Sequence, residues 1–182
     1  MSLWTWRTSN GTIGGLGLRL GVYLIFLIAA TLLQAVVLPI LFPYVRPDLV
    51  LLLVVMWGLL GGPVQGGIVG ALGGLVVDLF SGRFIGMGIL TKGLVGVLVG
   101  WLEPRFFKDN LIVPVTFSVC ATLGEQLLYW LLLSAFGWGP PFDYVLFRII
   151  VPTVLFDAVI AYPAFLLVRE IENFLREFQR NP

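Results

Sequence analysis

The sequence contains no histidine and a single cysteine. The absence of histidine removes the commonest general base and the commonest zinc ligand, and it excludes serine–histidine proteolysis. One thiol, Cys120, cannot form an internal disulfide and argues against a thiolate metal cage. The spacing of the other residues does not resemble a nucleophile with its base or a phosphate-binding loop. We therefore expect a protein that is not an enzyme and that holds no cofactor and no metal.

Charged residues are also scarce, at 12% of the chain, whereas soluble domains carry about 25%. The formal net charge of +1 provides no field for gripping nucleic acid, so we expect no nucleic-acid partner. Hydrophobic residues make up 59% of the chain, and the mean hydropathy is +1.01. Almost none of this chain can face bulk water, and its expected environment is the lipid bilayer.

The amount of apolar sequence sets the expected number of spans. A bilayer core about 30 Å thick needs roughly 20 apolar residues per helix, so the 182 residues accommodate about six spans. We predict an all-α fold, a polytopic membrane bundle of about six transmembrane helices. The predicted spans are residues 17–38, 47–60, 63–80, 86–102, 111–136 and 144–168. They form one domain, 17–168, between an N-terminal cytoplasmic segment, 1–16, and a cytoplasmic tail, 169–182.

Three of these spans have features of their own. The second is only about 14 residues, or about 20 Å of helix, and Gly61-Gly62-Pro63 then predicts a tight hairpin with the third. The sixth contains Pro152 and Pro163, which should kink it unless neighbouring groups satisfy the freed carbonyls. The first exceeds the roughly 7 to 15 residues of a signal-peptide core, so we expect it to remain in the mature protein.

Basic residues near the span ends predict the orientation. With both termini in the cytoplasm, seven basic residues lie inside and three outside, in agreement with the positive-inside rule. The inner set is Arg7, Arg19, Arg105, Lys108, Arg169, Arg176 and Arg180, and the outer set is Arg46, Arg83 and Arg148. We therefore predict that both termini are cytoplasmic.

Glycines recur at four-residue spacing in the third span and at spacings of three and four residues in the fourth. The third contains Gly66, Gly70 and Gly74, and the fourth contains Gly93, Gly96 and Gly100. Because lipid provides no hydrophobic drive between helices, such glycines allow a neighbouring backbone to approach closely. They predict that these two spans pack together or dock a partner helix. The plain alternative is that glycine is simply common in membrane helices.

Five ionisable side chains within or beside the spans are the candidate site, since such residues normally face the bundle interior or a wet cavity. They are Asp48, Asp78, Lys92, Glu125 and Asp157. Their depths predict an outward-facing polar pocket, with Lys92 paired to Glu125 or Asp157. The alternative is that they are structural ion pairs that fix helix register. For Asp78, the favoured interpretation is a structural clasp with Arg83.

The tail and two glutamines complete the polar features. In residues 169–180, the apolar side chains fall on one face, as in a helix that lies on the membrane surface. These are Ile171, Phe174, Leu175 and Phe178. The alternative is a plain extension of the last span. Gln34 and Gln65 are interpreted as interfacial.

Several of these motifs together resemble the bacterial rod shape-determining protein MreD family. Residues 47–53 place Pro47-Asp48 at the start of the second span, and residues 75–82 end the third span with Asp78-Leu79-Phe80-Ser81-Gly82. The glycine stripe lies between them, and the next span begins near Leu90. Residues 151–165 also look like the family's last span. The resemblance covers most of 17–170 and is strongest over 47–100.

The resemblance implies a non-enzymatic subunit of the cell-elongation machinery in the bacterial cytoplasmic (inner) membrane. Members of the family bind the single-pass protein MreC and are linked through it to MreB filaments and the peptidoglycan synthases. The family fold is similar to that of the six-helix substrate-binding subunits of energy-coupling vitamin transporters. These properties are expectations for this chain.

Two functions from different classes follow. The first is a membrane scaffold that holds MreC and helps to regulate lateral wall synthesis, with the glycine-lined faces and the short second span as docking surfaces. The second is the substrate-binding membrane subunit of a small-molecule transporter, which uses the polar pocket. An enzyme of lipid-linked precursors is disfavoured, because the chain lacks the expected catalytic cluster at one face.

Overall fold

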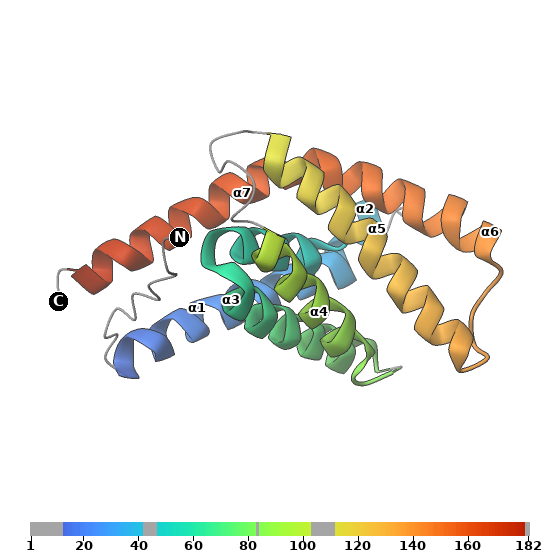
Figure 1. The fold of residues 1–182 in the computed structure, drawn as a ribbon, viewed down its shortest axis with the longest axis horizontal. Coiled ribbons are helices and arrows are strands. Elements are labelled where there is room, and N and C mark those ends of the chain that lie inside the picture. The colour runs from blue at the N-terminus through green and yellow to red at the C-terminus, as the bar shows by residue number, and fades with distance from the viewer. Residues whose placement is uncertain (1–12, 42–46, 83, 103–111, 181–182) are drawn as a thin grey trace, which may run out of the picture.

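A computed structural model describes residues 13–41, 47–82, 84–102 and 112–180, which contain helices and no strand. The helices are α1 (Ile13–Leu32), α2 (Leu38–Leu41), α3 (Leu49–Ser81), α4 (Met87–Leu102), α5 (Ile112–Ala135), α6 (Phe142–Val145) and α7 (Val151–Arg180). Two π-helical turns, η1 (Leu33–Val37) and η3 (Leu146–Ile150), continue α1 into α2 and α6 into α7. The all-α prediction is confirmed over these residues (Figure 1).

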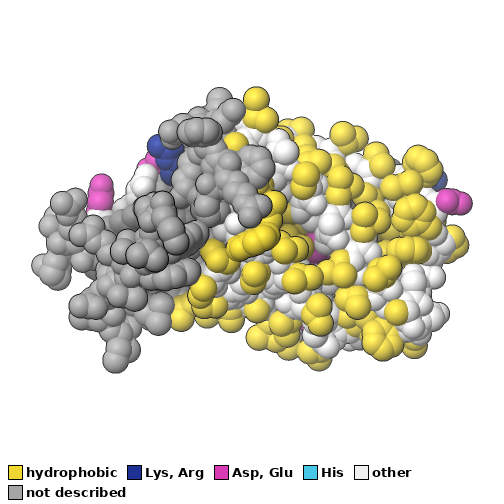
Figure 2. Space-filling view, in the orientation of Figure 1, with side chains coloured by type: hydrophobic (Ala, Val, Ile, Leu, Met, Phe, Trp, Pro, Cys, Tyr) yellow, Lys and Arg dark blue, Asp and Glu magenta, His cyan; other side chains and the backbone are white. Residues whose placement is uncertain are grey.

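Four stretches of the described chain are long and apolar enough to cross a membrane: Leu18–Leu41, Leu49–Ser81, Ile112–Ala135 and Phe142–Leu175. Met87–Leu102 is a shorter apolar helix. Hydrophobic side chains cover most of the described face in Figure 2, and most of the visible charged side chains lie at its two ends. These features indicate a membrane protein with four to five helices that could span the bilayer, whereas six were predicted from the sequence.

The count differs because the predicted second and third spans are joined in one helix, α3, which turns back on itself at Gly62. Gly62 has φ 82° and ψ −173°, a conformation that L-residues with side chains rarely adopt, and Pro63 follows it without an N–H to donate. A Cβ atom on Gly73 would lie 2.8 Å from Val50 and 3.6 Å from Val54, so the two arms of α3 run side by side. The predicted hairpin is therefore present, and Figure 1 shows the bend.

The first arm of α3, residues 49–61, is the centre of the molecule. Every residue from Val50 to Leu59 is buried, which is the pattern of a helix surrounded on all sides by others. The ring of Trp57 packs against Tyr23 of α1 at 4.6 Å between centroids, and Leu27 of α1 is also fully buried. The arm is thus enclosed by its neighbours from Val50 to Leu59.

The second arm of α3, residues 63–81, packs against α4 through glycines. A Cβ atom on Gly66 would overlap the carbonyl oxygen of Gly96, and one on Gly70 would overlap that of Lys92. A Cβ atom on Gly74 would likewise overlap the backbone of Gly88. The two backbones approach so closely that a methyl group does not fit between them, which is the arrangement that small residues permit in lipid.

This contact uses most of the predicted glycines. Gly100 lies against the backbone of Gly62 and Pro63, whereas Gly93 has room for a methyl group, 3.7 Å from Ala71. The glycine faces of α3 and α4 are therefore filled by each other. The suggestion that they form the docking surface for a partner helix is wrong, because the chain itself already occupies them.

Two prolines in the described helices, Pro39 and Pro152, closely follow π-helical turns. η1 immediately precedes the helical segment that contains Pro39, and η3 ends two residues before Pro152. A wider turn relieves the clash and the missing donor that proline introduces into a regular helix. α7 then continues without a break through Pro163 to Arg180.

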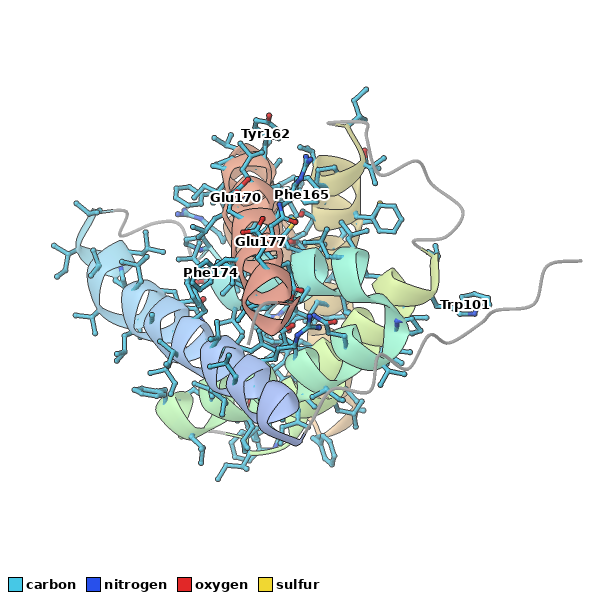
Figure 3. The ribbon with its side chains drawn as sticks, turned by 90° about the vertical axis from the view of Figure 1, so that its left-hand side faces the viewer. Trp101, Tyr162, Phe165, Glu170, Phe174 and Glu177 are labelled. Carbon is cyan, nitrogen blue, oxygen red and sulfur yellow. The ribbon has the colours of Figure 1, made fainter. Side chains whose placement is uncertain are left out.

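Residues 169–180 of the predicted tail are the end of α7, which continues into them from the last span without a break. Leu175 is buried, whereas Phe174 is largely exposed and lines a groove with Leu18, Val22 and Phe26 of α1. Figure 3 views the molecule from this end and places Phe174 on the side of α7 toward α1, with Tyr162 pointing away. The structure thus has the plain extension, and the side chain of Phe178 lies outside the described residues.

Candidate functional site

Lys92 of α4 lies at the centre of the candidate site. It is almost completely buried, and its Nζ forms ion pairs with Asp48 Oδ2 and, at 3.1 Å, with Glu125 Oε1. The predicted pairing of Lys92 with Glu125 is therefore present, and Asp48 is a second partner. The ion pairs join α4 to the start of α3 and to the middle of α5.

Asp48 also begins α3. Its Oδ1 accepts a hydrogen bond from Leu51 N at 2.8 Å, the geometry of a helix N-cap, while its Oδ2 faces Lys92. Val50 N donates to Gln34 Oε1 of η1 at 3.4 Å. Gln34 is thus a partner of the first turn of α3, a role that its position near a span end did not predict.

Asp157 of α7 closes the site from the opposite side. Its Oδ1 accepts from Asp48 N at 3.3 Å, and its Oδ2 lies 2.9 Å from the hydroxyl of Thr122 on α5. Thr91 Oγ1, next to Lys92 on α4, donates to Glu125 Oε1 at 3.1 Å. Side chains from α3, α4, α5 and α7 therefore meet at one point, and we call Asp48, Lys92, Glu125 and Asp157 the ionic cluster.

Asp78 is separate from the ionic cluster and caps the start of α4. Its carboxylate accepts from the backbone N–H groups of Gly86 at 2.8 Å, Gly88 at 3.0 Å and Ile89 at 3.4 Å. These are the free donors at the start of α4, which favour a negative charge. Its inclusion among the predicted pocket residues is wrong, and its predicted partner, Arg83, lies outside the described residues.

A second buried polar group was missed in the sequence. Tyr23 Oη donates to Glu172 Oε1 at 2.5 Å, and Gln65 Nε2 donates to Tyr23 Oη at 2.6 Å and to Glu172 Oε1 at 3.1 Å. Glu172 is buried between Val168 and Leu175, which are also buried. Helical spacing from Val168 and Leu175 placed Glu172 on the buried side, and this signal could have revealed it.

A cavity of about 1040 Å³ lies beside α5 at the end of the molecule away from the helix termini Ile13 and Arg180. Its lining is Ser81, Phe84, Gln126, Tyr129, Trp130, Leu133, Trp138, Pro140, Val145 and Ile149. Phe84 meets Trp138 edge to face at 5.6 Å, and Trp130 Nε1 donates to Pro140 O at 3.0 Å. The ionic cluster does not line it. The predicted pocket was charged, whereas the ten side chains that line this cavity are uncharged and four of them are aromatic.

The chemistry available to the ionic cluster is limited by its composition. The described residues contain no group of three or more histidine, cysteine, aspartate or glutamate side chains arranged to hold a metal ion. Three carboxyl groups around one ammonium form hydrogen bonds and ion pairs, and they can bind or release protons. Cys120 of α5 is exposed.

Comparison with known proteins agrees with the resemblance in the motifs. A model of the family described as rod shape-determining protein MreD matches residues 17–178, nearly the whole chain. No curated protein and no solved structure matches the chain. The expected likeness to vitamin-transporter subunits therefore has no support from a solved structure. Since the match extends from the start of α1 almost to the end of α7, this chain belongs to the rod shape-determining protein MreD family.

Proposed function

We propose that this chain is a non-enzymatic subunit of the bacterial cell-elongation complex, in the cytoplasmic (inner) membrane, and that it binds the single-pass protein MreC. Through MreC it is linked to MreB filaments and to the peptidoglycan synthases, and it helps to maintain rod shape by regulating lateral peptidoglycan synthesis. The family match over residues 17–178 is the observation that carries the proposal. The apolar helices support a position within the membrane.

In this proposal the chain crosses the membrane six times, with both termini in the cytoplasm. The two arms of α3 count as separate crossings, and α1, α4, α5 and α7 supply the other four. An even number of crossings is supported by Figure 1, in which α1 begins and α7 ends toward the same end of the molecule. The excess of basic residues assigned to that side supports the orientation.

An apolar groove is the proposed docking surface for the single helix of MreC. It has a volume of about 660 Å³ between α1, α3 and α7, and its lining is Phe26, Ala29, Ala30, Leu33, Leu49, Leu52, Leu53, Ile160, Pro163, Ala164 and Leu167. Ala29, Ala30 and Ala164 allow a neighbouring backbone to come close, as association in lipid requires. Unlike the glycine faces of α3 and α4, this groove is open.

Co-purification of MreC from a bacterial membrane tests both parts of the proposal. Wild-type chain should retain MreC. An Ala164→Phe variant, in which the phenyl ring fills the groove, should retain several-fold less. Val159→Phe places the same ring on an exposed position of α7 outside the groove and should retain MreC fully.

Two results would count against this assignment. If wild-type chain retains no MreC, the function itself is wrong. If folded Ala164→Phe and Ala29→Phe variants both retain MreC at the wild-type level, the partner docks elsewhere.

The cavity beside α5 favours a second candidate function, the binding of a small molecule as in a transporter subunit. A volume of about 1040 Å³ is large enough for a vitamin-sized ligand, and four of the ten lining residues are aromatic. Native mass spectrometry of the purified chain decides this question. A stoichiometric small molecule that is lost in a Trp130→Ala variant would favour the second function over the scaffold.

A further inference from the structure

The ionic cluster has an imbalance of charge. It contains three carboxyl groups, from Asp48, Glu125 and Asp157, and the single ammonium of Lys92. Lys92 pairs with the first two of these carboxyl groups. Within the part of the chain that the structure describes, Asp157 has no ion-pair partner. Full ionisation would therefore leave two uncompensated negative charges among apolar helices.

The surroundings of Asp157 accommodate a neutral acid better than a carboxylate. Asp157 is fully buried. Asp48 lies directly beside it, as the hydrogen bond from Asp48 N to Asp157 Oδ1 shows. Burial and a nearby like charge both disfavour a second carboxylate. The hydroxyl of Thr122 can accept as well as donate, so the 2.9 Å contact with Oδ2 also suits a carboxylic acid that donates its proton.

We propose that Asp157 is a proton-binding site, and that its proton holds the middle of α7 against α3 and α5. The charged group in contact with it is Asp48, at the start of α3. Asp48 in turn pairs with Lys92 from α4, which also pairs with Glu125 from α5. Loss of the proton places a third negative charge next to a single ammonium. The repulsion loosens α7 at this level, so the packing of α7 responds to pH.

The movement is confined to one part of α7. Four turns beyond Asp157, Glu172 on the same helix is held by Tyr23 and Gln65 through hydrogen bonds of 2.5 and 3.1 Å. The end of α7 therefore stays anchored to α1 and α3 while the segment around Asp157 is released.

Infrared spectroscopy of the full chain in lipid nanodiscs tests for the proton directly. At neutral pH we expect the carbonyl stretch of a protonated carboxylic acid, which shifts in heavy water and is absent from an Asp157→Asn variant. Asp143→Asn removes an exposed carboxyl group and should leave the band unchanged. Thr122→Val, which keeps the acid but removes its hydrogen-bond partner, should shift the band.

The inference is overturned if the wild-type spectrum lacks the band, or if the band persists in Asp157→Asn. Should Asp157→Asn not fold, the Thr122→Val spectrum decides: an unshifted band assigns the proton to another group.

Spin labels on Leu155 of α7 and Leu127 of α5 then test the consequence, with Cys120 replaced by alanine. Both label positions are exposed. The distribution of distances between the labels should broaden as the pH rises in the otherwise wild-type chain, and it should be independent of pH in Asp157→Asn. The same pH response in both chains, or none in either, would overturn the link between the proton and α7.

Discussion

α4 forms two interfaces, one held by close backbone packing at glycines and the other by buried ion pairs. Toward the second arm of α3 it presents Gly88 and Gly96, and backbone meets backbone without intervening side chains. Toward α3's start and α5 it presents Lys92, whose long side chain carries a charge into the interior. The first interface depends on shape alone, and the second depends on charges that must be matched. One short helix can thus be fixed on one side by the smallest residues and on the other by ion pairs.

Removal of the Lys92 ammonium tests the contribution of the ion pairs to this difference most strongly. A Lys92→Met variant leaves Asp48 and Glu125 buried without their partner, which typically costs about 3–5 kcal/mol. We expect the largest loss in the free energy of unfolding, measured by tryptophan fluorescence in mixed micelles. Adding Asp48→Asn and Glu125→Gln to this variant removes the stranded charges and should restore much of the loss. A triple variant as unstable as Lys92→Met would show that the ion pairs are not what stabilises this interface.

We expect a larger side chain in the glycine interface to destabilise the protein through steric clash. Gly74→Leu inserts a side chain into the backbone of Gly88 and Ile89, and overpacking of this kind costs about 1–3 kcal/mol. The same assay of unfolding measures it. Gly124→Leu on α5 is the matched control, since a Cβ atom there meets nothing within 4 Å. Equal stability of the two variants would contradict the close packing of α3 and α4.

The start of α4 offers the smallest of the three tests. Asp78→Ala removes the acceptor for Gly86, Gly88 and Ile89, and loss of a helix cap costs about 0.5–2 kcal/mol. Asp78→Asn retains an acceptor and should lose less. Hydrogen exchange at the first turn of α4 should accelerate in Asp78→Ala more than elsewhere. An unchanged exchange rate there would mean that the cap does not hold the helix start.

Much of the fold was predictable because hydropathy and proline or glycine breaks act locally. The hairpin at Gly62 follows from three consecutive residues, and the helices follow from their apolar runs. Local sequence does not reveal whether a glycine face packs against a helix of the same chain or of another protein, because small residues permit close packing in both cases. The sequence therefore could not show that Gly66 and Gly74 are filled from within.

The site was harder to predict because its members are distant in sequence. Asp48 and Asp157 are 109 residues apart, and hydropathy does not reveal which buried charges meet. The pairing of Lys92 with Glu125 could be anticipated because an isolated charge in a membrane needs a partner. A structural role was favoured for Asp78, but its partners could not be predicted, because it lies within α3 and caps the next helix from eight residues before Gly86. The aromatic cavity has no signature in the sequence.

The short first arm of α3 has a consequence for how the protein is made. The start of this arm lies among other helices, where no water accepts hydrogen bonds from its first backbone N–H groups. Side chains accept them instead. The N–H of Val50 donates to Gln34, that of Leu51 to Asp48, and that of Asp48 to Asp157. The last of these acceptors belongs to the final helix. During synthesis, the start of this arm stays incomplete until α7 enters the bilayer, so a chain truncated before α7 should be an early target for membrane quality control.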